Sequence, residues 1–472
     1  MLFSSIDFLF YFLPLTVALY FLVPMPEGSP KLRNYFLLIA SLVFYAWGGP
    51  WYLILITLQS FTGWLFGLLI ERWRGGPGAR AALIGSLVTG LGILLFFKYA
   101  NFFLTNVNFL FHSSIPLLKI MLPLGISFYT FQILSYVIDL YLGKTSVQRN
   151  FFTLFAYIAL FPQLIAGPIV RYLDVEQALR RREHSVDLFA SGVRRLMIGL
   201  GKKVLIANVL GELAYILKDG AELSLLSAWL YITAYAFHIY FDFSGYSDMA
   251  IGLGRMFGFR FLENFNYPYI ARNVTDFWRR WHISLSGWFR DYVYIPLGGN
   301  RVSGPRHVLN ILTVWLLTGF WHGANWNFIF WGLYFALLLL LEKFVFGRLL
   351  EKLPRPFSHL YLALCVLIGW TFFDAASLGA AVAQISYMFG SGINSFAGPD
   401  TLYYLRSYLV PLLAAAIGCT PLPTRLAAKL AGSAKGTAAL TVLEPLFVAV
   451  LIVTVTAYLV DGSFNPFIYF RF

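Results

Sequence analysis

The chain has 472 residues, of which 59% are hydrophobic and 12% are charged, about half the charged share of a soluble domain. Apolar stretches long enough to cross a bilayer recur from end to end and the mean hydropathy is +0.71, which excludes a soluble fold and predicts an all-α polytopic membrane protein. We attribute the net charge of +13 mainly to basic loops that set the orientation of the helices in the membrane. We expect no nucleic-acid partner.

The first half of the chain contains five candidate spans, at roughly residues 6–23, 35–47, 51–70, 81–98 and 118–141. The first apolar run lacks a basic start, so we expect a spanning helix there and not a cleavable signal peptide. Basic loops after the first, third and fifth spans predict that these loops are cytoplasmic and that the N-terminus is periplasmic. The basic residues are Lys31, Arg33, Arg72, Arg74, Arg80, Lys144 and Arg149.

Residues 151–170 are apolar, but they are followed by Arg171 and Arg180, which also favour the cytoplasm. Both ends of this segment therefore lie on one side of the membrane, which predicts a re-entrant loop and not a crossing. The residues that break the helix are Pro162, Gly167 and Pro168.

The second half continues the same alternation of sides. Segments 190–210 and 224–243 cross out and back, and the basic, aromatic stretch 244–307 predicts re-entrant and interfacial helices on the cytoplasmic face. Residues 308–341 go out and back, and the last spans are 360–373, 402–418 and 441–460. We therefore expect about 11 transmembrane helices in a single domain over residues 1–472, with a periplasmic C-terminal tail at 461–472.

A histidine lies where the hydrophobicity predicts the membrane interior. His322 follows the apolar run 308–320 and precedes the run 326–341, so it is expected near the turning point of a helical pair. An ionisable side chain at this depth is costly unless it faces protein or a water-filled cavity, which makes His322 a candidate functional residue. The alternative is a packing histidine bonded to a neighbouring carbonyl.

The densest polar segment is residues 276–301, rich in tryptophan, arginine and tyrosine. If it is helical, positions 278, 281, 285, 288 and 292 share one aromatic face, and Arg279, His282 and Ser286 form an adjacent stripe. Arginine binds phosphate oxygens well because its planar donors can engage two oxygens at once. The alternative is an aromatic belt at the membrane interface with arginines on lipid phosphates.

Other polar features are weaker. Asp242 and Asp248 lie six residues apart beside small residues, which suits an ion site, a proton relay or the capping of a re-entrant helix. Cys365 and Cys419 lie in apolar segments and indicate neither a disulfide framework nor a metal cluster, so no metal site is predicted.

Taken together, these segments resemble the membrane-bound O-acyltransferase (MBOAT) family, in its bacterial alginate O-acetyltransferase (AlgI-like) branch. The Trp-His-x-Ser segment around His282 and the Phe-Trp-His-Gly segment around His322 carry the resemblance. Residues 123–129, Gly167-Pro168 and the stretch from Asp242 to Asp248 support it. The resemblance covers essentially the whole chain and implies helices around a central funnel that meets the buried histidine.

The resemblance implies an enzyme that moves an acetyl group from a cytoplasmic donor across the inner membrane. Transfer from a thioester to a hydroxyl requires a base, and neutral imidazole is the usual one near pH 7. We expect His322 to be this base, and His282 to orient the base, the donor or the thioester carbonyl. The other expected site residues are Arg279, Arg280, Trp281 and Ser284 for donor binding, and Asn325, Asp242 and Asp248 in support.

The expected donor is acetyl-CoA, with an acyl-carrier protein as the alternative, and no cofactor is expected to be bound permanently. The expected acceptor is an exported polysaccharide, alginate first and cellulose or peptidoglycan otherwise. Family systems of this kind hand acetyl to a periplasmic acetyltransferase of SGNH type within a polysaccharide secretion complex, which we expect as the partner. A rival class is a transporter or export scaffold without transferase activity, because deep aspartates, histidines and broken helices also mark transport pathways.

The C-terminal tail 467–472 is aromatic and resembles an aromatic-x-tyrosine motif of related envelope acyl-transfer systems. A phenol has a pKa of ~10, so its ester has a better leaving group than an alkyl ester and can pass acetyl to a sugar hydroxyl. Tyr469 is therefore a possible acyl carrier. The alternative is an interfacial anchor.

Overall fold

The computed structural model describes residues 1–26, 29–219, 223–393 and 395–461, and the regular elements in these ranges are helices. The chain divides into two compact units. Two of the three boundaries fall within helices α9 (Val186–Gly201) and α11 (Leu225–Met256), and the third falls between Leu262 and Glu263. The all-α fold predicted from composition is confirmed. The tail with Tyr469 lies outside the described residues.

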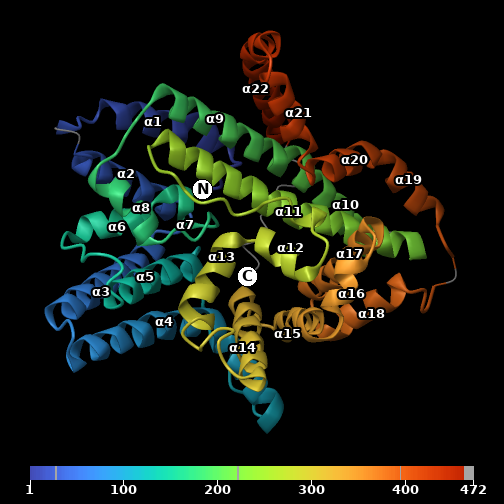
Figure 1. The fold of residues 1–472 in the computed structure, drawn as a ribbon, viewed down its shortest axis with the longest axis horizontal. Coiled ribbons are helices and arrows are strands. Elements are labelled where there is room, and N and C mark those ends of the chain that lie inside the picture. Colours follow the sequence, from blue (N-terminus) through green and yellow to red (C-terminus); the bar gives the residue numbers. More distant parts are fainter. Residues whose placement is uncertain (27–28, 220–222, 394, 462–472) are drawn as a thin grey trace. The chain divides into compact units, whose positions relative to one another are not determined.

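The first unit consists of residues 1–196 and 247–262. Its helices α3, α4 and α5 pack side by side (Figure 1). The helices of this unit before α9 are α1 (Leu13–Leu22), α2 (Lys31–Ala46), α3 (Tyr52–Arg72), α4 (Pro77–Phe111), α5 (Ile126–Tyr141), α6 (Phe151–Ala159), α7 (Phe161–Leu164) and α8 (Tyr172–Arg180). The predicted break within 151–170 is confirmed, because α6 ends before Leu160 and no helix continues between α7 and α8.

The second unit consists of residues 197–246 and 263–472 and contains both histidines of interest. Its central helices are α12 (Val274–Arg280), α13 (Ile283–Phe289), α14 (Gly304–His322), α15 (Trp326–Leu341) and α17 (Arg355–Asp374). The others are α10 (Val209–Asp219), α16 (Gly347–Lys352), α18 (Leu378–Met388), α19 (Pro399–Ser407), α20 (Leu409–Gly418), α21 (Leu422–Ala431) and α22 (Ala434–Val460), with π-helical turns η3 (Lys202–Asn208), η5 (Arg290–Tyr294) and η6 (Glu342–Phe346).

Five helices among the described residues are long and apolar enough to cross a membrane, and the bent pair α20–α21 makes a sixth if it forms one span. The five are α3, α4, the continuous run Trp326–Lys352, α17 and α22. Only 6% of the apolar window of α22 is buried within the protein, so this helix exposes apolar side chains all round, as a lipid-facing span does. The predicted total of about 11 spans includes shorter and broken helices and stays a prediction.

Candidate active site

His322 is the last residue of α14, and three residues connect it to α15. The predicted helical pair and its turning point are confirmed, and the side chain is only 5% exposed. The two helices touch through their backbones at two glycines. A Cβ atom on Gly319 would lie 2.3 Å from the carbonyl oxygen of Phe328, and one on Gly332 would lie 2.3 Å from that of Trp315, so larger residues would separate the helices.

Aromatic rings surround the His322 imidazole. The ring centroids of Trp321 and Trp331 lie 5.0 Å from that of His322, and that of Phe373 from α17 lies 5.2 Å away. Trp331 and Phe373 meet the imidazole nearly edge to face. These rings exclude bulk water, so any charge or hydrogen bond formed at His322 acts in a medium of low dielectric constant.

His282 lies at the junction between α12 and α13 and is 1% exposed. Its backbone is left-handed, with φ of 45°, a conformation that is uncommon for residues other than glycine. The single helix through positions 278–292 that would give one aromatic face is therefore not formed. Because the helix is interrupted at His282, this residue does not follow the helical spacing of its neighbours, and its side chain is buried in the interior.

Asn264 holds the His282 ring from one side. Its carboxamide oxygen accepts hydrogen bonds from the Ser284 amide at 3.2 Å and from the Ser284 hydroxyl at 2.9 Å, and lies 3.2 Å from Nδ1 of His282. Because this oxygen can only accept, Nδ1 must carry the proton. Burial also lowers the pKa of His282, so the ring is neutral and its Nε2 atom has a free lone pair.

The structure brings the two histidines against one indole, that of Trp321. The Trp321 ring centroid lies 6.1 Å from His282 and 5.0 Å from His322. Around them, four buried polar atoms have no hydrogen-bond partner among the described residues: His282 Nε2, Trp278 Nε1, Trp331 Nε1 and Asn327 Oδ1. Buried polar groups are usually satisfied, so such a concentration marks a place where a ligand could complete the bonds.

The residues predicted to bind the donor separate into different environments. Arg279 is exposed and forms no ion pair with the described residues, whereas Arg280 donates from Nε to both Asp276 oxygens at 3.0 Å. Trp281 is 4% exposed and stacks on Phe277 with centroids 5.6 Å apart, which makes it a packing residue. A contact between Trp281 and a donor stays a prediction.

The predicted supporting residues lie elsewhere. Asn325 is exposed, and its amide donates to the Ala376 carbonyl at 3.4 Å, while the nearby Asn327 is buried instead. Asp242 and Asp248 lie inside α11 and not at its ends, so neither caps this helix. Asp242 forms an ion pair with Lys203 at 2.6 Å within the second unit. Asp248 forms an ion pair with Arg195 at 2.6 Å within the first unit.

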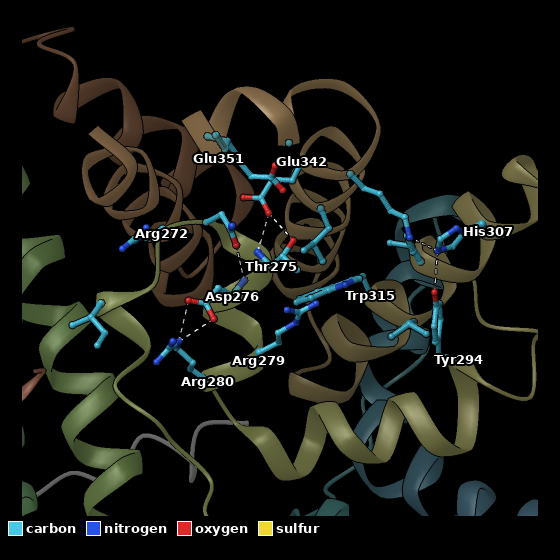
Figure 2. Close-up of a pocket in the computed structure, with 18 residues that line it drawn as sticks. Arg272, Thr275, Asp276, Arg279, Arg280, Tyr294, His307, Trp315, Glu342 and Glu351 are labelled. Atoms are coloured by element: carbon cyan, nitrogen blue, oxygen red, sulfur yellow. Dashed lines mark hydrogen bonds and ion pairs between the residues drawn. The ribbon is translucent and has the colours of Figure 1, made fainter. Parts of the chain in front are cut away.

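An open cavity of about 910 Å³ lies beside Arg279 (Figure 2). Residues from α12, α14, α15, η6 and α16 line it, including Trp315, His307 and Lys343. Its volume falls within the usual range for small-molecule sites, about 300–1,000 Å³. In the described ranges, no group of three His, Cys, Asp or Glu side chains is arranged to hold a metal ion.

Comparison with known proteins shows which family this chain resembles. Residues 146–373 match the model of MBOAT, the membrane-bound O-acyltransferase family. The chain is 44% identical over 399 residues to "Probable alginate O-acetylase AlgI" of Pseudomonas aeruginosa, covering 83% of this chain and 75% of that protein. It is 36% identical over 422 residues to "Peptidoglycan O-acetyltransferase" of Helicobacter pylori, covering 83% of this chain and 80% of that protein. The chain belongs to the membrane-bound O-acyltransferase family.

The protein is therefore a membrane-embedded O-acyltransferase, as the histidine motifs predicted. The matched part of this acyltransferase, residues 146–373, contains both His282 and His322 together with the cavity, and Tyr469 lies beyond it. A more distant relative, "Teichoic acid D-alanyltransferase" of Bacillus subtilis, is 33% identical over 234 residues, covering 47% of this chain and 59% of that protein.

Asn264 and Asn327 were not predicted as site residues. Asn264 precedes His282 by 18 residues and lies outside any helix, so no periodicity connects the two. Asn327 is two residues from the predicted Asn325. Which of the two side chains points inward depends on the residue at which α15 begins.

Proposed function

We propose that this acyltransferase moves acetyl from a thioester donor on the cytoplasmic side to an exported polysaccharide, alginate first. The names of the similar Pseudomonas aeruginosa and Helicobacter pylori proteins support O-acetylation of an envelope or exported polymer, with peptidoglycan as the alternative acceptor. The observation that carries the proposal is the pair of buried histidines that both contact the Trp321 ring. They lie in an aromatic enclosure with buried polar atoms that have no hydrogen-bond partner among the described residues.

In this proposal His322 is the general base. Its imidazole takes the proton of the acceptor hydroxyl while the oxygen attacks the thioester carbonyl. The tetrahedral intermediate then collapses, the carbon–sulfur bond breaks, and the imidazolium returns the proton to the leaving thiolate. His282 would hold an O–H or N–H group of a substrate on its Nε2 lone pair, because a carbonyl oxygen would need a donor there.

The donor in this proposal is acetyl-CoA, or alternatively an acetylated carrier protein, and the partner is a periplasmic acetyltransferase of SGNH type. The enzyme would lie in the bacterial inner membrane with both termini in the periplasm, as the basic loops predict. On that side Tyr469 would accept acetyl from the His322 site and pass it to the partner.

The test is transfer of labelled acetyl from acetyl-CoA by the purified full-length protein, with and without the periplasmic partner. We expect His322→Ala to lose about 10²–10⁴-fold in rate while its size-exclusion profile and unfolding temperature stay normal. The matched control is His112→Asn, since His112 is exposed and its left-handed backbone tolerates asparagine. Wild-type transfer by folded His322→Ala would refute the mechanism, and no turnover by wild type with its partner would favour a transporter or scaffold.

A further inference from the structure

A separate cavity of about 460 Å³ lies within the first unit, between the end of α1, the start of α9 and the end of α11. Its lining combines apolar side chains with an imidazole and a guanidinium, and contains no carboxylate of the described residues. The lining residues are Phe21, His184, Ser185, Val186, Phe189, Arg255 and Met256.

The apolar wall of this cavity is open to the outside of the protein. Val186 is 84% exposed, and Phe21 is also exposed. The rings of Phe21 and Phe189 meet edge to face with centroids 5.8 Å apart, and Leu22 beside them is exposed as well. Since α1 lies within the first predicted span, an apolar surface at its end is suited to lipid chains.

Arg33 of α2 lies against this wall. Its guanidinium carbon is 5.5 Å from the centroid of the Phe21 ring, and its Nε donates to the Val23 carbonyl at 2.9 Å. Its other N–H groups have no acceptor in the part of the chain that the structure describes. Arg33 therefore has donors available for an anion that the protein does not supply.

A buried arginine adds positive charge next to the cavity. Arg182 is 3% exposed, and its partners are the Tyr20 hydroxyl, the Asn34 carboxamide oxygen and a backbone carbonyl, all of them neutral. It also lies close to His184, because a Cβ atom on Gly258 would be 2.9 Å from Cδ of Arg182 and 2.9 Å from Cε1 of His184. A buried charge without an opposite charge is costly, so an anion bound nearby would stabilise it.

His184 reports this positive environment from inside the cavity. Burial and, after it, the positive charges of Arg33 and Arg182 lower the pKa of His184 to about 4. Its Nε2 atom lies 3.1 Å from the Tyr20 hydroxyl, so the ring is held in place. The imidazole is neutral at pH 7, and the cations around the cavity are arginines.

We propose that this cavity is a binding site for one anionic phospholipid. Arg33 and Arg255 bind its phosphate, because charge-assisted bonds from guanidinium to phosphate are the strong ones. Phe21, Val186 and Phe189 pack against the start of an acyl chain. A free phosphate would leave this apolar wall unused, which favours the lipid.

The side of the membrane agrees with this ligand. The basic loops that follow α1 and α8 predict that this end of the first unit is cytoplasmic, and anionic lipids give the cytoplasmic leaflet its negative surface potential. The site goes beyond the proposed acetyl transfer, since it contains no residue of the histidine site.

The experiment measures retention of phosphatidylglycerol by the purified full-length protein in neutral detergent, by native mass spectrometry over a lipid titration. Val186→Glu places a carboxylate on the exposed edge of the cavity and should weaken binding about 5-fold, the effect of one charge near an anionic headgroup. Val186 is the first residue of α9, where a carboxylate suits the helix dipole, so the variant should fold. Val186→Gln, which has the same size without the charge, is the matched control and should bind like wild type.

A second variant tests the cation. Arg33→Gln should also weaken phosphatidylglycerol binding about 5-fold. Its control is Arg181→Gln, which removes an exposed positive charge that does not line the cavity and should have no effect. Phosphatidylcholine, which has no net charge, is titrated in parallel, and its binding should be the same for all variants.

Glycerol phosphate separates the lipid from a free phosphate ester. It lacks acyl chains, so we expect an equimolar amount to leave phosphatidylglycerol bound, and displacement would overturn the lipid assignment. Unchanged phosphatidylglycerol binding in Val186→Glu and Arg33→Gln, with wild-type unfolding temperatures in detergent, would overturn it too. Equal weakening of phosphatidylcholine would also contradict it, because the arginines would then not recognise the charge of the headgroup.

Discussion

Replacing Asn264 tests whether the state of the His282 ring matters for catalysis. Asn264→Leu keeps the approximate side-chain volume but removes the oxygen that receives the Ser284 amide, the Ser284 hydroxyl and Nδ1 of His282. With this acceptor gone, nothing at that position selects the Nδ1–H tautomer, and Nε2 can carry the proton instead. A protonated Nε2 cannot accept the substrate O–H or N–H that we propose it holds.

The magnitude follows from the bonds removed. Three hydrogen bonds at about 1 kcal/mol each, with buried donors left unsatisfied, give an expected loss of roughly 2–4 kcal/mol in the free energy of unfolding. The transfer rate should fall by about 10²-fold, at the low end of the range for acid–base residues, because the imidazole remains present. Rates are measured as labelled acetyl transfer at a temperature where unfolding curves show the variant fully folded.

Asn264→Asp is the conservative counterpart. A carboxylate still accepts the three hydrogen bonds, so it should restore stability and most of the rate at alkaline pH. Its negative charge raises the pKa of His282, and the neutral ring is then lost at a higher pH than in wild type. The acid limb of the rate profile should therefore move to higher pH. Full activity of folded Asn264→Leu, with an unchanged pH profile, would refute the role assigned to this ring.

Two further substitutions test other parts of the molecule. Glu342→Gln should lower the free energy of unfolding by about 1–3 kcal/mol, measured by thermal unfolding in detergent, because the Glu342 carboxylate accepts the backbone amides of Val274 and Thr275 at the start of α12. A variant as stable as wild type would show that α12 does not depend on this cap. Tyr469→Phe removes only a hydroxyl, so it should abolish polymer acetylation if Tyr469 carries acetyl, and full acetylation would leave the tail as an anchor.

The sequence allowed the helical framework to be predicted because hydrophobic runs and helix breakers are local features. The pair α14–α15 and the break near Pro162 follow directly from them. Helices α8, α10, α18 and α21 lie outside the predicted spans, and α10 occupies residues expected to form a loop. Leu378–Met388 is short for a span, and Leu422–Ala431 carries basic residues that were assigned to a loop.

Site residues could be predicted only where a reactive side chain lies in a recognisable sequence motif. His282 and His322 stand out because an imidazole is unexpected among apolar residues, and the structure places both against Trp321. The different environments of Arg279 and Arg280 could not be predicted, because they depend on which of the two arginines forms the ion pair with Asp276. Asn264 could not be predicted either, since a chain reversal brings it to His282 without any repeating spacing.

The close glycine contacts between α14 and α15 have a consequence for engineering this enzyme. Gly319 and Gly332 each lie against the backbone of the opposite helix. The position of His322 relative to α15 is therefore set by main-chain contact and not by the size of the surrounding side chains. Residues of the enclosure such as Phe373 can therefore be exchanged for smaller ones while the imidazole keeps its position. Variants of this kind offer a way to admit acyl groups longer than acetyl on an otherwise unchanged scaffold.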